Sequence, residues 1–218
     1  MINHKQQQTS LSSQTGFTII ESLVAILVAG ILLAAIAPVI VLSVGTRLQA
    51  RRVELATDTA KTYLDGIRTG TIPAPPSTGT DAITLDQYPA PKANTLTCSP
   101  NSYCSQPSAD LYCMSSCSTT KDFVVQAFRY SIASNDVTNG YSLGIRVYRV
   151  DAFKDNDNTN LGKGAKQATF IGEVGGLKYR KSPVVEITTE VSNSSTTLDS
   201  LCKRLNNASN QTTNPHCS

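Results

Sequence analysis

The sequence predicts an α+β fold, in which a long N-terminal helix packs on a roughly four-stranded antiparallel sheet with disulfide-stapled loops. Three observations lead to this prediction. Residues 22–44 form an uncharged apolar run, a period-two pattern begins at residue 122, and all six cysteines lie beyond residue 97. With 218 residues, 40% of them hydrophobic, the chain can form one modest globular domain beside a membrane helix.

The apolar run predicts a membrane-spanning segment over residues 19–44, the first half of a helix over residues 17–70. At ~1.5 Å per residue, its 23 uncharged positions reach roughly 35 Å, more than the ~30 Å of a hydrocarbon core. Glu21 lies at the start of this run, and a carboxylate there is costly unless it serves a partner or a function. The plain alternative is an anchor whose Glu21 sits among lipid headgroups.

The second half of the helix is amphipathic. Beyond Thr46, apolar or small residues recur at helical spacing on one face: Leu48, Val53, Ala56, Ala60, Tyr63 or Leu64, and Ile67. Gly70 and Pro73 then end the helix. We expect this face to cover the apolar face of the sheet.

Residues 71–121 are rich in proline and cysteine, a composition that favours a stapled loop region over long regular elements. Paired cysteines persist in oxidising compartments, so the even cysteine count predicts disulfides and an exported domain. A zinc site is the alternative, but the spacing lacks C-x₂-C pairs and no histidine is near. The sequence leaves three pairings open for the first four of the six cysteines: Cys98, Cys104, Cys113, Cys117, Cys202 and Cys217.

Residues 122–191 are expected to form the sheet, because apolar side chains alternate there at period two. Four strands are predicted, at 124–132, 141–147, 168–174 and 184–191, with one apolar face. A turn over 135–140 joins the first two as an antiparallel hairpin. Residues 192–218 form a polar tail that the local pair Cys202–Cys217 would close.

No cofactor is expected, with calcium as the one alternative. The run over residues 155–162 offers alternating oxygen ligands, and Asp155 and Asp157 are its first candidates. However, Asn160 stands where a hand-like calcium loop has glycine, and Lys166 where it has glutamate. Runs of Asp and Asn are also ordinary turn material.

Polysaccharide or DNA binding would rest on a small basic cluster at residues 178–181, although a solvated loop is the commoner interpretation of such a cluster.

No constellation for catalysis is present. The chain has two histidines, His4 and His216, near its two ends, and it has no phosphate-binding loop. The sequence therefore predicts a protein that is not an enzyme.

The order of residues around Glu21 is specific. Gly16 and Phe17 come first, Glu21 is the fifth residue counted from Phe17, and about twenty apolar residues follow. This resembles the class III signal of type IV pilins and pseudopilins, and Gly30 and Pro38 also fit the helix of that family. The resemblance covers Gly16 to about Ala60.

The resemblance implies a leader over residues 1–16, cut by a prepilin peptidase between Gly16 and Phe17, with N-methylation of Phe17. It implies that Glu21, Gly30 and Pro38 act in assembly with other pilin or pseudopilin subunits, on an inner-membrane assembly platform. The helix over Gly30 to Pro38 would loosen as the subunit enters a filament.

By this resemblance the chain is a structural subunit, a minor pilin or pseudopilin of a type IV pilus or a type II secretion-like filament. It would cross the inner membrane once, surrounded by lipid, with its domain outside the cytoplasm, and then join a pilus or a periplasmic or cell-surface filament. Arg47, Arg51 and Arg52 oppose this orientation, since positive residues favour the cytoplasmic side.

The tract from Tyr141 to Phe153 loosely resembles cyanobacterial pseudopilins linked to polysaccharide secretion. The alternative from another functional class is a membrane-anchored extracytoplasmic binding module for polysaccharide or DNA.

Overall fold

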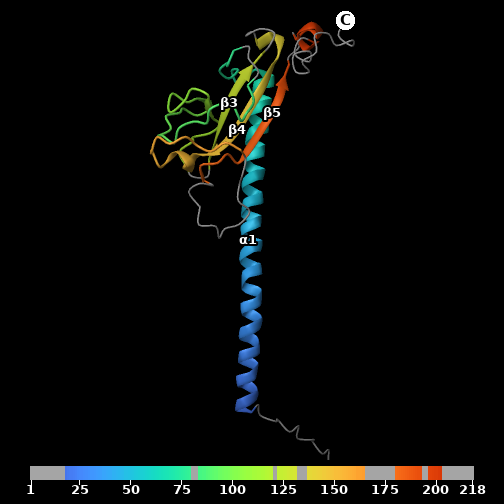
Figure 1. The fold of residues 1–218 in the computed structure, drawn as a ribbon, viewed down its shortest axis with the longest axis vertical. Helices are drawn as coiled ribbons and strands as arrows, with labels where there is room; N and C mark the ends of the chain where they lie inside the picture. The colour runs from blue at the N-terminus through green and yellow to red at the C-terminus, as the bar shows by residue number, and fades with distance from the viewer. Residues whose placement is uncertain are drawn as a thin grey trace, which may run out of the picture. The chain divides into compact units, whose positions relative to one another are not determined.

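The computed structural model describes residues 18–79, 83–119, 122–131, 137–164, 180–192 and 196–202. The chain divides into two compact units, residues 1–44 and 45–218, and each is described by itself. Helix α1 (Ile19–Thr69) is the described element of the first unit and continues as the first element of the second (Figure 1).

In the first unit, α1 is apolar on all sides. The described residues from Thr18 to Val44 are all exposed within the chain, and Glu21 is their one charged side chain. The mean hydropathy of the most apolar 18-residue window is 3.0, and this helix is long and apolar enough to cross a membrane. The predicted apolar helix is therefore confirmed.

In the second unit, α1 buries one face against the sheet. Ala56, Ala60, Tyr63 and Ile67 are buried, and they pack with inward-facing residues of the strands. This is the face that the helical spacing predicts, except for Leu48, which is 51% exposed. The helix ends at Gly70, whose φ of 74° suits a glycine.

The sheet has five antiparallel strands in the order β1-β2-β3-β4-β5. Three of them confirm predicted strands, while the predicted strand over 168–174 lies outside the described residues. Two short strands come from the region expected to be loop, because strand pairing rather than local sequence pattern makes them extended: β2 pairs with β3, and β1 pairs with β2. The strands are β1 (Ser102–Tyr103), β2 (Leu111–Cys113), β3 (Phe123–Tyr130), β4 (Tyr141–Arg149) and β5 (Val185–Val191).

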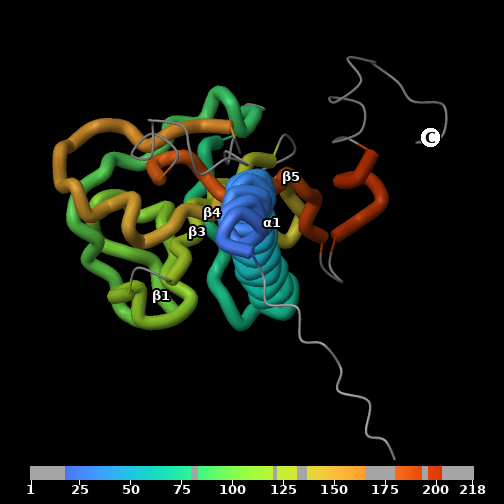
Figure 2. The backbone as a smooth tube through the Cα atoms, turned by 90° about the horizontal axis from the view of Figure 1, so that it is seen from below, coloured from blue at the N-terminus to red at the C-terminus, as the bar shows by residue number. Residues whose placement is uncertain are grey.

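The prediction of one apolar face is wrong, since both faces of the sheet are covered. One face packs on α1 through Val125, Ala127, Leu143 and Ile145, among others. The other face packs under the loop region, where a second cluster includes Val124 and Tyr148. Figure 2 shows β3 and β4 beside α1, with the green and orange loops on the far side of the strands. Apolar side chains therefore pack against the sheet on both of its faces.

The disulfides select one of the three open pairings. Cys98 pairs with Cys104, and Cys113 pairs with Cys117. Three of these four cysteines are buried in the second apolar cluster, so the staples also supply core contacts where the loop sequence is poor in apolar residues. Cys202 is disulfide-bonded as well. Its predicted partner, Cys217, lies outside the described residues.

Candidate functional site

The N-terminus of α1 is the first candidate site. The predicted processing residues, Gly16 and Phe17, lie outside the described residues. Thr18 precedes the helix, and its Oγ1 accepts a hydrogen bond from the Glu21 backbone N–H at 3.4 Å. A threonine followed three residues later by glutamate is the arrangement of a capping box, and an acid in the first turn also suits the helix dipole.

The Glu21 side chain is exposed, and no described residue pairs with its carboxylate. The next charged residue along the chain is Arg47. Ser22, its neighbour, turns its hydroxyl back to the helix and donates to the Ile19 carbonyl at 2.8 Å. The carboxylate is therefore the one charged group of the described first unit, and it is open to a group from another molecule.

Gly30 and Pro38 both lie inside a continuous α-helix. A Cβ added to Gly30 would meet nothing within 4 Å, so no contact within the chain requires a glycine there. Pro38 removes one backbone hydrogen bond, which a helix in lipid tolerates where neighbouring groups compensate. Loosening of the helix over Gly30 to Pro38 stays a prediction for the assembled state.

The candidate calcium carboxylates face cations. Asp155 accepts hydrogen bonds from the Arg180 guanidinium, one of them at 2.5 Å, and lies 3.6 Å from Lys181. Asp157 pairs with Lys181 and accepts from the Thr159 hydroxyl at 2.7 Å. Hydrogen bonds from Lys181 and Thr159 lower the pKa of Asp157 to about 2.

The asparagines on either side of Asp157 form turns and connect this loop to residues 94–95 by hydrogen bonds. Asn156 and Asn158 have φ values of 48° and 57°. The Asn156 side chain accepts from the Thr95 N–H at 3.1 Å, and that of Asn158 accepts from Asn94 at 3.1 Å. No group of three His, Cys, Asp or Glu suited to a metal occurs among the described residues. Calcium binding stays a prediction that these contacts leave untested.

Sequence reasoning missed a polar row on the sheet face away from α1. The strand register places Gln126, Arg146 and Glu186 opposite one another on β3, β4 and β5. Arg146 is 1% exposed; its Nε donates to Glu186 at 2.8 Å and its Nη1 to Gln126 at 3.1 Å. The sequence did contain a signal for this row: Arg146 stands between Ile145 and Val147, so it lies on the other face of the strand from these apolar residues.

Arg146 also holds the segment that covers this face. Its guanidinium donates to the carbonyl oxygens of Leu85, Tyr88 and Pro89. Tyr88 stacks on Phe128 with ring centroids 3.9 Å apart. The hydrogen-bonding capacity of the guanidinium is therefore taken up inside the domain, and its role is to position the covering segment.

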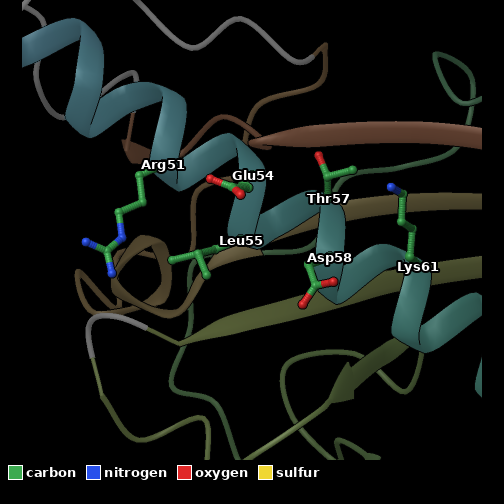
Figure 3. Close-up of a pocket in the computed structure, with 6 residues that line it drawn as sticks. All are labelled: Arg51, Glu54, Leu55, Thr57, Asp58 and Lys61. Atoms are coloured by element: carbon green, nitrogen blue, oxygen red, sulfur yellow. The ribbon is translucent and has the colours of Figure 1, made fainter.

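The exposed side of α1 in the second unit carries a shallow open groove. Figure 3 shows its lining side chains projecting from successive turns of the helix. Two of the lining side chains are cationic, two are anionic and one is apolar. The lining residues are Arg51, Glu54, Leu55, Thr57, Asp58 and Lys61.

A model of the prokaryotic N-terminal methylation motif matches residues 11–37. This match contains Gly16, Phe17, Glu21 and Gly30, and it ends one residue before Pro38. No curated protein and no solved structure matches the chain. The resemblance of the tract over 141–153 to cyanobacterial pseudopilins lies outside the matched residues.

The motif is the class III signal of type IV pilins and pseudopilins, which are structural proteins rather than enzymes. An apolar helix follows it directly, and the second unit joins an amphipathic helix to an antiparallel sheet with disulfides. This combination fits a membrane-anchored, surface-exposed subunit that assembles with others of its kind. The chain therefore carries the class III signal of type IV pilins over residues 11–37, on an α+β architecture that is pilin-like.

Proposed function

We propose that the chain is a minor pilin or pseudopilin, a structural subunit of a type IV pilus or a type II secretion-like filament. The observation that carries this proposal is the methylation motif over residues 11–37, followed by a helix in which Glu21 is the one charged side chain up to Val44. Neither feature is needed by a simple membrane anchor.

Processing creates the partner of Glu21. A prepilin peptidase hydrolyses the Gly16–Phe17 peptide bond, and the new amine of Phe17 is then methylated. A methylated amine keeps its positive charge, so each processed subunit has a cation at the start of its helix and a carboxylate four residues later.

Glu21 of one subunit then pairs with the Phe17 amine of its neighbour. In lipid or in a dry helix bundle an unpaired carboxylate is strongly disfavoured, so the pairing fixes the register between helices as well as their affinity. The apolar halves of the helices pack side by side. The second units face outward and form the surface of the filament.

The first experiment is to determine the N-terminal residue and the mass of the protein recovered from its native membranes. We expect a chain that begins at methylated Phe17. A chain that begins at Met1, or that is cut elsewhere, would contradict the pilin pathway and would favour the membrane-anchored binding module.

The second experiment compares Glu21→Gln with wild type in sheared filaments and in the membrane fraction. Glutamine serves a capping box as well as glutamate does, so Glu21→Gln keeps the helix start and removes only the charge. We expect normal membrane insertion and at least a tenfold loss of incorporation, about 1.4 kcal/mol per tenfold change.

Ser22→Ala is the matched control, because it removes a neighbouring hydroxyl whose hydrogen bond stays within the helix. We expect Ser22→Ala to leave incorporation unchanged. If Glu21→Gln is incorporated as well as wild type, the carboxylate acts only as a cap and the assembly role is wrong.

A further inference from the structure

The second unit begins with a run of cationic residues. Arg47, Arg51 and Arg52 follow the apolar run on α1, and the first acidic residue after it is Glu54. All three arginines are exposed. No described residue forms a salt bridge with them. Within the described residues, no salt bridge therefore neutralises their charge.

Within the second unit, Val53 of α1 packs against the apolar cluster that contains Val147, near the end of β4. Tyr141, the first residue of β4, lines one groove with Ile67 near the end of α1. Asp151 lies two residues past the end of β4; burial raises its pKa, and Arg52 is among the cations that oppose this rise. β4 therefore runs antiparallel to α1, and the loops that follow β4 lie at the Arg52 end of this unit.

The end of β4 and the loops beyond it add four cations, Arg149, Lys154, Arg180 and Lys181. Asp151 pairs with Arg149 at 2.5 Å, and two further carboxylates pair with Arg180 and Lys181. Lys154 is exposed and forms no salt bridge with a described residue. Glu54 and Asp122 are further acids near these cations. We call the seven cations the basic collar: Arg47, Arg51, Arg52, Arg149, Lys154, Arg180 and Lys181.

The three arginines of the collar on α1 follow the apolar run within a few residues of the chain. Gly45, the first residue of this unit, is bonded directly to Val44 at the end of the apolar run. Arg52 is seven residues further along the helix, roughly 10 Å at 1.5 Å per residue. That distance is comparable with the ~8–10 Å over which ions screen a charge at physiological salt.

We propose that the basic collar binds anionic lipid headgroups in the leaflet that the domain faces, and so holds the domain against the membrane. Headgroup phosphates accept paired hydrogen bonds from guanidinium groups, and basic segments beside a membrane span are attracted to anionic lipid. The proposal rests on the membrane anchor and is independent of filament assembly.

The collar also explains a charge pattern that the anchor alone does not. In the orientation proposed above, three arginines follow the span on the non-cytoplasmic side, where positive residues oppose insertion. A simple anchor gains nothing from them there. Contact between these arginines and anionic headgroups outside the cytoplasm gives them a role in that place.

The test uses the full chain in lipid nanodiscs, with amide hydrogen exchange measured over residues 150–158. One set of discs contains neutral phosphatidylcholine only, and the other adds about a third anionic phosphatidylglycerol. We expect exchange in this segment to slow about five- to tenfold in the anionic discs. In ~1 M salt, where screening shortens to ~3 Å, the difference should disappear.

The test variant is Arg51→Ser with Lys154→Ser, two exposed residues that no described side chain pairs. We expect the slowing in the anionic discs to be clearly smaller in this variant than in wild type, because Arg47 and Arg52 remain. Lys61→Ser is the control, because Lys61 is an exposed cation of the same helix sixteen residues past Gly45, roughly 24 Å away. Unchanged exchange of the β3 and β4 amides shows that each variant is folded.

Equal exchange in neutral and anionic discs would overturn the proposal, and so would a Lys61→Ser effect as large as that of the double variant. Protection that depends on the number of chains per disc rather than on lipid charge would assign the collar to a second copy. Protection by an acidic polysaccharide or DNA, with none from anionic lipid, would assign it to that polymer. Each of these outcomes rejects the lipid-binding collar while leaving processing at Gly16 intact.

Discussion

The two halves of α1 differ in what their side chains contact. From Thr18 to Val44 no described residue is buried within the chain, although almost all of them are apolar. From Gly45 to Thr69, polar residues are frequent and one stripe is buried, with Ala56, Ala60 and Tyr63 at 0% exposure. The first half therefore needs an apolar environment from outside the chain, whereas the second half finds one in the sheet.

Charged groups in the two units also differ in whether a described residue of the chain pairs with them. Glu21 has no described partner, whereas Arg146 has a carboxylate, an amide oxygen and three carbonyl oxygens. A buried charge is stable only when it is paired and hydrogen-bonded, so Arg146 is a structural residue of the domain. A charge without an internal partner in an apolar segment indicates an intermolecular one.

Tyr63→Ala is expected to have the largest effect on domain stability. Tyr63 is fully buried, its hydroxyl lies 2.8 Å from that of Tyr103, and burial together with Tyr103 raises its pKa. The loss should be about 3–5 kcal/mol, as for other large aromatic residues replaced by alanine in a core.

The measurement is urea unfolding of the full chain in detergent, followed by near-ultraviolet circular dichroism of tyrosine, since the chain has no tryptophan. Leu55→Ala is the control, because Leu55 is 49% exposed on the opposite side of the same helix. It should cost less than about 0.5 kcal/mol. Similar losses for both variants would contradict the one-sided packing of the second half.

Arg146→Met tests the internal pairing. Methionine fills much of the volume but removes the guanidinium from the carbonyl oxygens of residues 85–89 and from Glu186, which keeps the Gly164 N–H. Glu186 retains some solvent contact, at 15% exposure, so we expect a loss near the lower end of such substitutions, about 3 kcal/mol. The same urea measurement applies.

Arg68→Met is the matched control for this substitution, since Arg68 is exposed in the last turn of α1. It should change stability by less than about 0.5 kcal/mol. If Arg146→Met were as mild, the contrast between an internally paired charge and Glu21 would not hold.

Asp122 gives the smallest expected effect, a pH dependence. Burial raises the pKa of Asp122, but hydrogen bonds from Thr119, Ser116 and the Ser118 backbone outweigh it and hold the pKa below its usual value. Because the folded pKa is the lower one, the carboxylate contributes stability above its unfolded pKa, ~3.9, and loses that contribution as the pH falls through the folded value.

The stability difference between wild type and Asp122→Asn should therefore shrink as the pH falls from about 5 towards 3. Asparagine keeps an oxygen acceptor for the Thr119 N–H, which is 3.1 Å from the carboxylate in the folded chain. Urea unfolding at a series of pH values gives the difference. A difference that stays constant with pH would show that the hydrogen bonds do not depend on the charge.

The elements that the sequence predicts correctly have local patterns. α1 follows from its apolar run and from a stripe at helical spacing, and Gly70 marks its end. β3, β4 and β5 follow from alternation at period two. Each of these signals extends over neighbouring residues, so the chain need not be folded for the pattern to be recognised.

By itself, then, the sequence determined the signal motif, the two-part helix and the central strands, because these depend on residue identity and short-range spacing. The tertiary structure decided the pairing of Cys98 with Cys104 and Cys113 with Cys117, the short strands β1 and β2, and the burial of both sheet faces. It also placed Arg146 between Gln126 and Glu186. Those features join residues far apart in the chain, and only strand register and packing bring such residues together.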